Sequence, residues 1–123
     1  MINIYNHLSH IINSGNTTAT VDMKTIGQTT LLIYVDYIKG TETDLKLSFE
    51  VFHKRIGQWF PLQIENGTSI YDYIITLTDA GKYRIPIAVA FCEDKLRITA
   101  ALEGDLTTPG SADIWVSGAS LYL

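Results

Sequence analysis

Apolar and polar side chains alternate with a period of two through most of this chain, and that pattern limits the fold more than any other feature. It is clearest over residues 44–53, where Leu45, Leu47, Phe49 and Val51 fall on one face and polar side chains fall on the other. A period of two is typical of a β-strand with one face in a core and one in water. No segment repeats apolar residues at spacings of three and four behind a capping residue, so the sequence predicts no helix.

The alternation predicts eight or nine strands, separated by turn signals about every ten residues. This spacing favours an all-β fold, an antiparallel β-sandwich of jelly-roll-like type, and a small barrel is the alternative. The predicted strands cover residues 17–23, 29–38, 44–53, 58–65, 69–78, 82–92, 95–102 and 112–116.

Two tight connections suggest which strands are neighbours. The runs 29–38 and 44–53 are joined by a short glycine-containing segment and are interpreted as a central antiparallel hairpin. Asn66 and Gly67 tolerate positive φ, so they predict a type I′ turn between the next two strands. Pro61 has no backbone N–H, which predicts that its strand lies at a sheet edge or carries a bulge.

The length of 123 residues fits one domain, with residues 17–123 as the sandwich and residues 1–16 as a candidate N-terminal arm. The net charge of −4 argues against a nucleic-acid-binding surface, which needs a basic patch. A single cysteine, Cys92, excludes an internal disulfide and a cysteine-based zinc site. No apolar run reaches the length of a membrane span and no secretion signal is recognised, so we expect synthesis in a cytoplasm and no membrane partner.

The residue types that carry most protein chemistry form no catalytic pattern in this sequence. His7 and His10 are spaced for a metal on a helical turn, but no further ligands accompany them. Neither a Gly-Xaa-Ser-Xaa-Gly elbow nor a phosphate-binding glycine loop occurs. We therefore expect a protein that is not an enzyme and that has no metal or cofactor.

The carboxylates of the predicted connections are interpreted as solvated turn residues, because aspartate is common in turns for its own hydrogen bonding. Among them, Glu103 and Asp105 with nearby carbonyl groups make the best candidate for an ion site. The carboxylates concerned are Glu42, Asp44, Glu93, Asp94, Glu103, Asp105 and Asp113.

Four aromatic residues are the candidates for an interface. Tyr34, Phe52, Trp59 and Trp115 are each predicted on the strand face opposite the core. If they are exposed together, they form an interaction surface between subunits or a platform on which sugars stack. The alternative is that they close the second face of the sandwich or cover its ends.

Three segments of the second half give a resemblance to a known class of proteins. Residues 80–87, residues 95–98 and the stretch Thr107 to Val116 resemble, in their sequence of strands and turns, small all-β virion proteins of tailed bacteriophages. The segment around residues 32–43 fits the same resemblance. The class comprises capsid decoration (cement) proteins and related minor structural proteins of the virion.

This resemblance implies a non-enzymatic structural protein located in the virion and assembled in the host cytoplasm. Its partners would be the major capsid protein or other virion proteins of the head or neck, and it would form a homo-oligomer, with a trimer as the natural guess. The alternative from another class is a carbohydrate- or receptor-binding β-sandwich that stacks sugars on Trp59 or Trp115.

Overall fold

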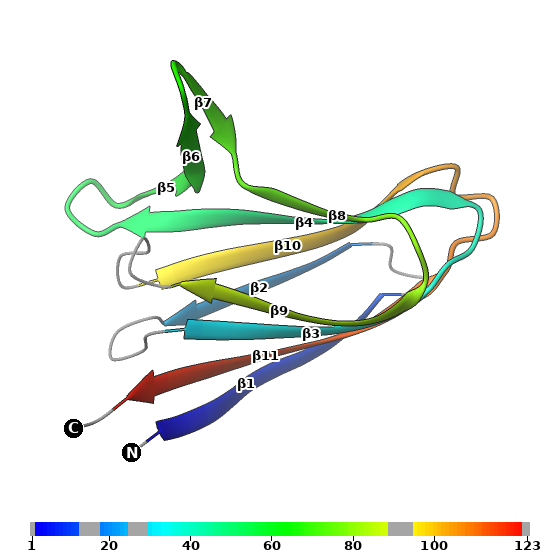
Figure 1. The fold of residues 1–123 in the computed structure, drawn as a ribbon, viewed down its shortest axis with the longest axis horizontal. Coiled ribbons are helices and arrows are strands. Elements are labelled where there is room, and N and C mark those ends of the chain that lie inside the picture. Colours follow the sequence, from blue (N-terminus) through cyan, green and yellow to red (C-terminus); the bar gives the residue numbers. More distant parts are fainter. Residues whose placement is uncertain (1, 13–17, 25–29, 89–94, 122–123) are drawn as a thin grey trace.

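The computed structural model describes residues 2–12, 18–24, 30–88 and 95–121, and in these residues the chain forms strands and no helix (Figure 1). The described residues also contain no helix long and apolar enough to cross a membrane. The strands are β1 (Ile2–Ile12), β2 (Thr18–Lys24), β3 (Thr30–Ile38), β4 (Glu42–His53), β5 (Gln58–Pro61), β6 (Gln63–Asn66), β7 (Ser69–Asp72), β8 (Ile74–Leu77), β9 (Gly81–Ala88), β10 (Lys95–Gly104) and β11 (Ser111–Leu121).

Two antiparallel sheets lie face to face. The first sheet has the order β1-β11-β3-β9, and the second has the order β2-β10-β4, with β5 and β8 both paired to the remaining side of β4. The predicted all-β sandwich is therefore confirmed. Nine strands make up the two sheets in the described part of the chain, and β6 and β7 form a separate two-stranded ribbon.

Strand pairs are nested along the sequence, and this nesting makes the sandwich a jelly roll. β1 pairs with β11, β2 with β10, β3 with β9, and β4 with β5 and β8. Such a set of pairs is one long antiparallel hairpin wound into two sheets, as in jelly-roll domains. The first and last strands are neighbours for the same reason, and the start of β1 lies beside the end of β11 (Figure 1).

The expected central hairpin is wrong, because β3 and β4 belong to different sheets. β3 pairs with β11 and β9, whereas β4 pairs with β10, β5 and β8. The connection over residues 39–41 crosses from one sheet to the other, so the two strands face each other across the core. Alternation told us which face of each strand is apolar, but a strand's neighbours are not contained in that pattern.

The core lies between the inner faces that alternation predicts. Tyr37 is the largest fully buried side chain among the described residues, and Phe49 packs against Tyr73 with ring centroids 5.4 Å apart. A continuous apolar core of this kind is the main source of stability in a β-sandwich. Its buried side chains are Leu31, Ile33, Val35, Tyr37, Leu45, Leu47, Phe49, Leu77, Ile87, Leu96, Ile98, Ala100, Leu102, Ala112, Ile114 and Val116.

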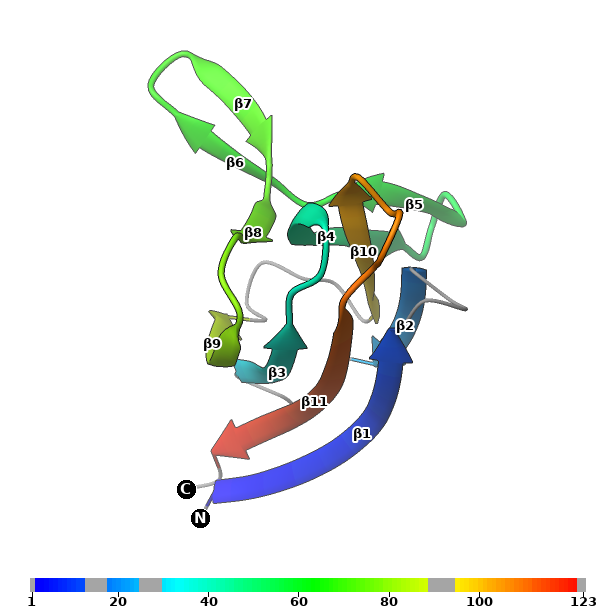
Figure 2. The same ribbon diagram turned by 90° about the vertical axis from the view of Figure 1, so that its right-hand side faces the viewer.

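The ribbon of β6 and β7 is an insertion into a single strand position of the second sheet. β5 pairs with the last part of β4 and β8 with an earlier part, and between them the chain leaves the sheet. At the point of departure, the Leu62 N–H donates to the Phe49 carbonyl and the Tyr73 N–H donates to the Leu62 carbonyl, at 2.9 and 2.7 Å. Figure 2 shows the ribbon projecting away from both sheets.

Two expectations about this region are therefore corrected. The strands predicted over residues 58–65 and 69–78 are each interrupted, after Pro61 and at Tyr73. The edge position predicted from Pro61 is confirmed, since β5 lies at the edge of the second sheet. Asn66 pairs with Ser69, so the two-residue loop is Gly67-Thr68, and positive φ at Gly67 alone fits a type II′ turn better than the predicted type I′.

The segment over residues 1–16 was expected to be an arm, and the structure incorporates most of it into the first sheet. β1 pairs with β11 from Ile2 opposite Leu121 to Ile12 opposite Ala112, with one register shift between Asn6 and Leu8. In this structure β1 is an edge strand of the sandwich. Cys92, the single cysteine, lies outside the described residues.

Candidate interaction surface

The four predicted interface residues lie on two opposite outer faces of the sandwich. Tyr34 and Trp115 are cross-strand neighbours on the first sheet, and Phe52 and Trp59 are cross-strand neighbours on the second. The structure therefore brings them together in pairs but does not form one patch from all four. Trp115 is exposed, and the other three are half-buried.

Phe52 and Trp59 belong to a cation–aromatic cluster on the second sheet, which we define as Asp22, Phe52, Trp59, Lys95 and Arg97. The guanidinium carbon of Arg97 lies 4.0 Å from the centroid of the Trp59 ring, and the Lys95 ammonium lies 4.9 Å from that of Phe52. The two aromatic rings are 5.2 Å apart. Arg97 therefore covers a face of the Trp59 ring, and that face is closed to a stacking ligand.

Arg97 also forms an ion pair with Asp22 across the strands β10 and β2. Its Nε donates to Oδ1 at 2.7 Å and its Nη2 donates to Oδ2 at 3.1 Å. These hydrogen bonds, with a smaller contribution from the nearby positive charges, hold the pKa of Asp22 below its usual range although partial burial acts in the opposite direction.

The substitution Arg97→Gln is expected to raise the pKa of Asp22. The amide keeps much of the length of the side chain but removes both charged donors. The ionised form of Asp22 is then less favoured relative to the protonated form. An NMR titration of the Asp22 carboxyl carbon measures the change. Lys95→Gln is the control, because Lys95 acts on Asp22 through distance-dependent charge alone, and its effect should be smaller. A larger shift in the control variant would contradict this assignment.

Tyr34 and Trp115 form a less enclosed pair on the first sheet. The Nε of Arg84 donates to the Tyr34 hydroxyl at 3.3 Å, and its guanidinium carbon lies 5.9 Å from the Tyr34 ring. Trp115 keeps 42% of its surface exposed. This pair presents aromatic surface to solvent, but a single exposed tryptophan beside a paired tyrosine is common on protein surfaces.

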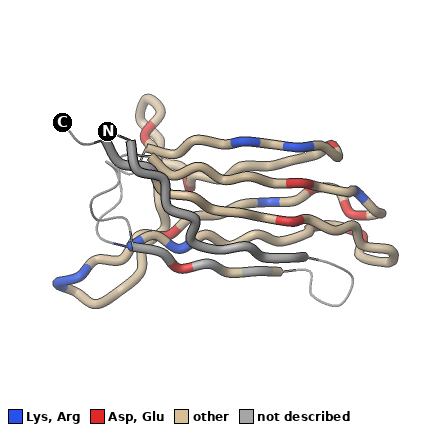
Figure 3. The backbone as a smooth tube through the Cα atoms, turned by 90° about the horizontal axis from the view of Figure 1, so that it is seen from below, with Lys and Arg blue, Asp and Glu red and all other residues tan. Residues whose placement is uncertain are grey.

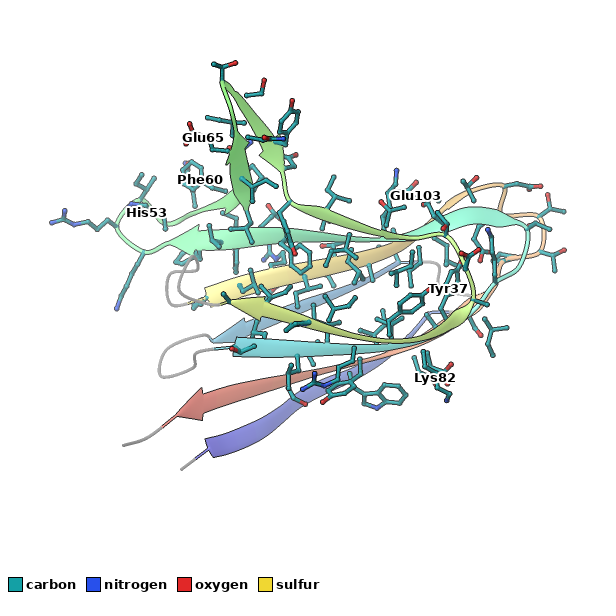
Figure 4. The ribbon with its side chains drawn as sticks, viewed as in Figure 1. Tyr37, His53, Phe60, Glu65, Lys82 and Glu103 are labelled. Atoms are coloured by element: carbon teal, nitrogen blue, oxygen red, sulfur yellow. The ribbon has the colours of Figure 1, made fainter. Side chains whose placement is uncertain are left out.

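One end of the sandwich is closed by a buried carboxylate, which the sequence reasoning had placed in water. Glu42 is 2% exposed, and it accepts hydrogen bonds from the Tyr37 hydroxyl at 2.5 Å and from the Gly110 N–H at 2.7 Å. It also accepts from the Gly40 N–H at 3.0 Å. We call these four residues the clasp; Tyr37 lies between the two sheets near this end (Figure 4). Because the carboxylate ties together the two crossing connections, it acts as a structural hub.

Electrostatics in the clasp follow from burial and from these hydrogen bonds. Burial by itself would raise the pKa of Glu42, but the donors on Tyr37, Gly40 and Gly110 outweigh it and lower the pKa to about 2. Burial and the hydrogen bond to the Glu42 carboxylate together raise the pKa of Tyr37 well above its usual range. The clasp is therefore an ionised carboxylate held by a neutral phenol, and none of its groups is poised to exchange a proton near neutral pH.

The remaining carboxylates at this end divide between burial and solvent. Asp44 is buried, contrary to expectation, whereas Glu103 and Asp105 are exposed, as expected. Asp105 accepts from the Thr107 N–H at 2.9 Å and from its hydroxyl, which lowers the Asp105 pKa and organises the turn. Within the described residues no three His, Cys, Asp or Glu side chains are arranged to hold a metal ion.

The ribbon is the surface that sequence reasoning missed. Every residue of β6 and β7 is exposed, including Ile64, Ile70 and Tyr71 at 47%, 67% and 53%. Of the nine large apolar side chains that are exposed in the described part of the chain, five lie between residues 60 and 74. An isolated two-stranded ribbon is marginally stable in water, so a ribbon with this much apolar surface is the feature that most needs a partner. The sequence feature that could have indicated the ribbon is Pro61, the residue at which the pairing of β5 with β4 ends.

A groove separates the ribbon from the edge of the first sheet. It has a volume of about 480 Å³, and its walls are predominantly apolar. β6 and the residues flanking the ribbon form one wall, and the end of β9 forms the other. Since β9 is the last strand of the first sheet, one side of it carries no strand partner in the described part of the chain. The lining residues are Leu62, Gln63, Ile64, Glu65, Tyr73, Pro86, Ile87 and Ala88.

Comparison with known proteins supports the fold and leaves the family open. No protein-family model matches the chain, and no curated protein sequence matches it. Among solved structures, the chain is similar to the SPBc2 prophage-derived protein YomS, with 10% sequence identity and a TM-score of 0.53. The alignment covers 98% of this chain and 94% of the other. At this identity the similarity shows a shared fold over the whole chain.

Proposed function

We propose that this protein is a non-enzymatic structural subunit of a bacteriophage virion. It would act as a capsid decoration or other head- or neck-associated protein that binds neighbouring virion subunits and forms a homo-oligomer, with a trimer as the expected state. The observation that carries the proposal is the exposed apolar ribbon beside an open groove. A surface of this kind is typical of a protein that works by binding another protein.

Two further observations support this proposal. The jelly roll is a fold used by viral capsid proteins, and the similar structure is described as prophage-derived. Both are fold-level analogies, which raise the expectation of a virion role without assigning it. Neither depends on the ribbon, so the fold and the binding surface are independent lines of support.

The carbohydrate-binding alternative is less favoured by the geometry. A sugar platform needs an open aromatic face, but Arg97 lies over the ring of Trp59 at 4.0 Å. Trp115 lies on the opposite sheet, so the two tryptophans do not form one platform. Titration of a glycan panel against tryptophan fluorescence is expected to give no response, and a saturable response would favour the alternative.

The test of the virion role is the composition of purified particles. Particles from the phage or induced prophage that encodes this chain are separated on a density gradient and analysed by quantitative mass spectrometry. We expect the protein to sediment with the major capsid protein in a fixed ratio. Its absence from particles, with the protein present in the lysate, would overturn the proposal. Purified protein should also rebind particles from a strain that lacks the gene.

A further inference from the structure

The turn at the end of the ribbon contains the only Asn-Gly pair in the sequence. Asn66 is the last residue of β6, and Gly67 and Thr68 form the loop that leads into β7. The chain has five asparagines, and Asn66 alone is followed by glycine. Figure 2 shows this turn at the end of the ribbon that lies away from both sheets. Asparagine is a chemically labile residue in proteins, so its place in an outlying turn has a consequence for the covalent structure.

We propose that Asn66 is a site of spontaneous deamidation, with water as the only co-reactant. The backbone nitrogen of Gly67 attacks the side-chain carbonyl carbon of Asn66, and a new C–N bond forms as that nitrogen loses its proton. The bond from the carbon to the side-chain nitrogen breaks, and ammonia leaves. Water then opens the cyclic imide at either of its carbonyl groups, which gives aspartate or isoaspartate. The inference goes beyond the proposed function, because the reaction needs no partner protein.

The surroundings of the pair leave the ring closure unobstructed. Glycine has no Cβ to shield its nitrogen, and a Cβ built at Gly67 would meet nothing within 4 Å. Asn66, Gly67 and Thr68 are all exposed. In the part of the chain that the structure describes, no hydrogen bond holds the Asn66 side chain. At the other end of the ribbon, by contrast, Gln63 donates to Asp72 at 2.9 Å. The Asn66 amide is therefore free to turn toward the next peptide group.

The ribbon also permits the backbone movement that the reaction needs. Ring closure requires a rotation about the Cα–C bond of Asn66, away from its extended strand conformation. The pairing of β6 with β7 holds this conformation through four residue pairs, the last of which joins Asn66 to Ser69. A two-stranded ribbon is marginally stable in water, and its end opens more readily than the strands of a sandwich. Asn3 and Asn6 lie instead in β1, which pairs with β11, and they precede isoleucine and histidine.

Both products change the surface of the ribbon. The ribbon has two acidic residues, Glu65 and Asp72, and no basic one (Figure 3), so either product adds a third negative charge. Isoaspartate also carries an additional CH₂ group in the main chain, at the position opposite Ser69. An added main-chain atom disturbs the regular spacing on which strand pairing depends. Older protein therefore presents a more acidic ribbon with a disrupted turn beside the exposed apolar side chains.

The test is peptide mapping of the full chain during incubation at neutral pH. Trypsin releases residues 56–82 as one peptide, in which Asn66 is the only asparagine. Mass spectrometry is expected to show progressive conversion of Asn66 to a mixture of aspartate and isoaspartate, while Asn3 and Asn6 remain amides. Gly67→Ala should slow the conversion at least about tenfold, a rise of about 1.4 kcal/mol in the activation barrier, because the added methyl group shields the attacking nitrogen.

The matched control is Thr68→Ala, which introduces the same residue one position later and keeps the Asn-Gly pair. It should react at the wild-type rate, whereas Asn66→Gln should leave the peptide unmodified over the same period. Circular dichroism should show native β-structure in each variant. The inference would be overturned if Asn66 remained an amide in the folded wild-type chain, or if Gly67→Ala reacted as fast as wild type. Aspartate without isoaspartate would also overturn it, because direct hydrolysis of the amide gives aspartate alone.

Discussion

The free energy of unfolding is expected to fall steeply between about pH 5 and about pH 2, and Glu42 is expected to account for about 3 kcal/mol of that loss. The pKa of Glu42 is about 2 in the folded protein, against an ordinary value of 4.5. A carboxyl group with a lowered folded pKa stabilises the protein fully above its unfolded pKa. That stabilisation disappears as the pH falls through the folded value.

The variant Glu42→Gln isolates this contribution. The amide presents N–H groups to a site built from donors on Tyr37, Gly40 and Gly110, so at neutral pH we expect a loss of roughly 2–4 kcal/mol. Near pH 2 the wild-type carboxyl is half protonated, so the difference in free energy of unfolding between wild type and Glu42→Gln should be smaller than at neutral pH. Urea unfolding at neutral pH and near pH 2 measures this difference.

The matched control for this experiment is Glu65→Gln, on the exposed ribbon. It removes the same charge from the chain but from a side chain that solvent surrounds, so its effect should stay within about 0.5 kcal/mol at either pH. If the difference in free energy of unfolding between wild type and Glu42→Gln were as large near pH 2 as at pH 7, packing and not ionisation would explain the role of Glu42.

Gly40→Ala is expected to destabilise the protein strongly, with a cost of about 3 kcal/mol or more. A Cβ at this position would collide with the Thr108 carbonyl oxygen and the Gly110 nitrogen, both of which are backbone atoms. Backbone atoms cannot move aside as a side chain can. The Gly40 and Gly110 N–H groups would therefore be displaced from the Glu42 carboxylate as well.

Gly67→Ala on the ribbon separates steric collision from backbone strain. Gly67 has a φ of +67°, but a Cβ there would meet nothing within 4 Å. Only the left-handed conformation is penalised, at about 1 kcal/mol. Midpoints of urea unfolding at unchanged slope compare the two variants. If Gly67→Ala proved as destabilising as Gly40→Ala, close packing at the clasp would not be the cause.

Sequence reasoning predicted the features of the fold that are encoded locally and missed those that depend on distant parts of the chain. The alternation in residues 44–53 identified Leu45, Leu47 and Phe49 as core residues, and the structure buries all three. Burial of one face is a local property that a period of two encodes directly. The pairing of β3 and β4 was mistaken because strand neighbours in a jelly roll are distant in the sequence, and a short connection can cross between sheets as easily as it can join a hairpin.

The candidate surface was harder to predict for a different reason. The ribbon has the same alternation as a buried strand, with Ile64 opposite Tyr71, so its sequence does not reveal that it leaves the sheet. Glu42 was predicted to be a solvated turn residue because the neighbouring sequence gives no sign of its buried hydrogen-bond donors. Its donors on Gly110 and Tyr37 are brought to it by the folded chain. Phe52 and Trp59 were placed on the correct faces, but their partner Arg97 comes from another strand.

The nested order of strand pairs also sets a sequence of events for the newly made chain. The innermost strands, β4 with β5 and β8, become available to each other early and close a short loop. Of the described strands, β1 is synthesised first and finds its partner last, since β11 must be complete before the two can pair. Until then one edge of the unfinished sandwich stays open, and closing it carries the largest loop entropy in the molecule. During translation β1 is therefore the strand most exposed to pairing with another chain, because it stays unpaired until β11 has been made.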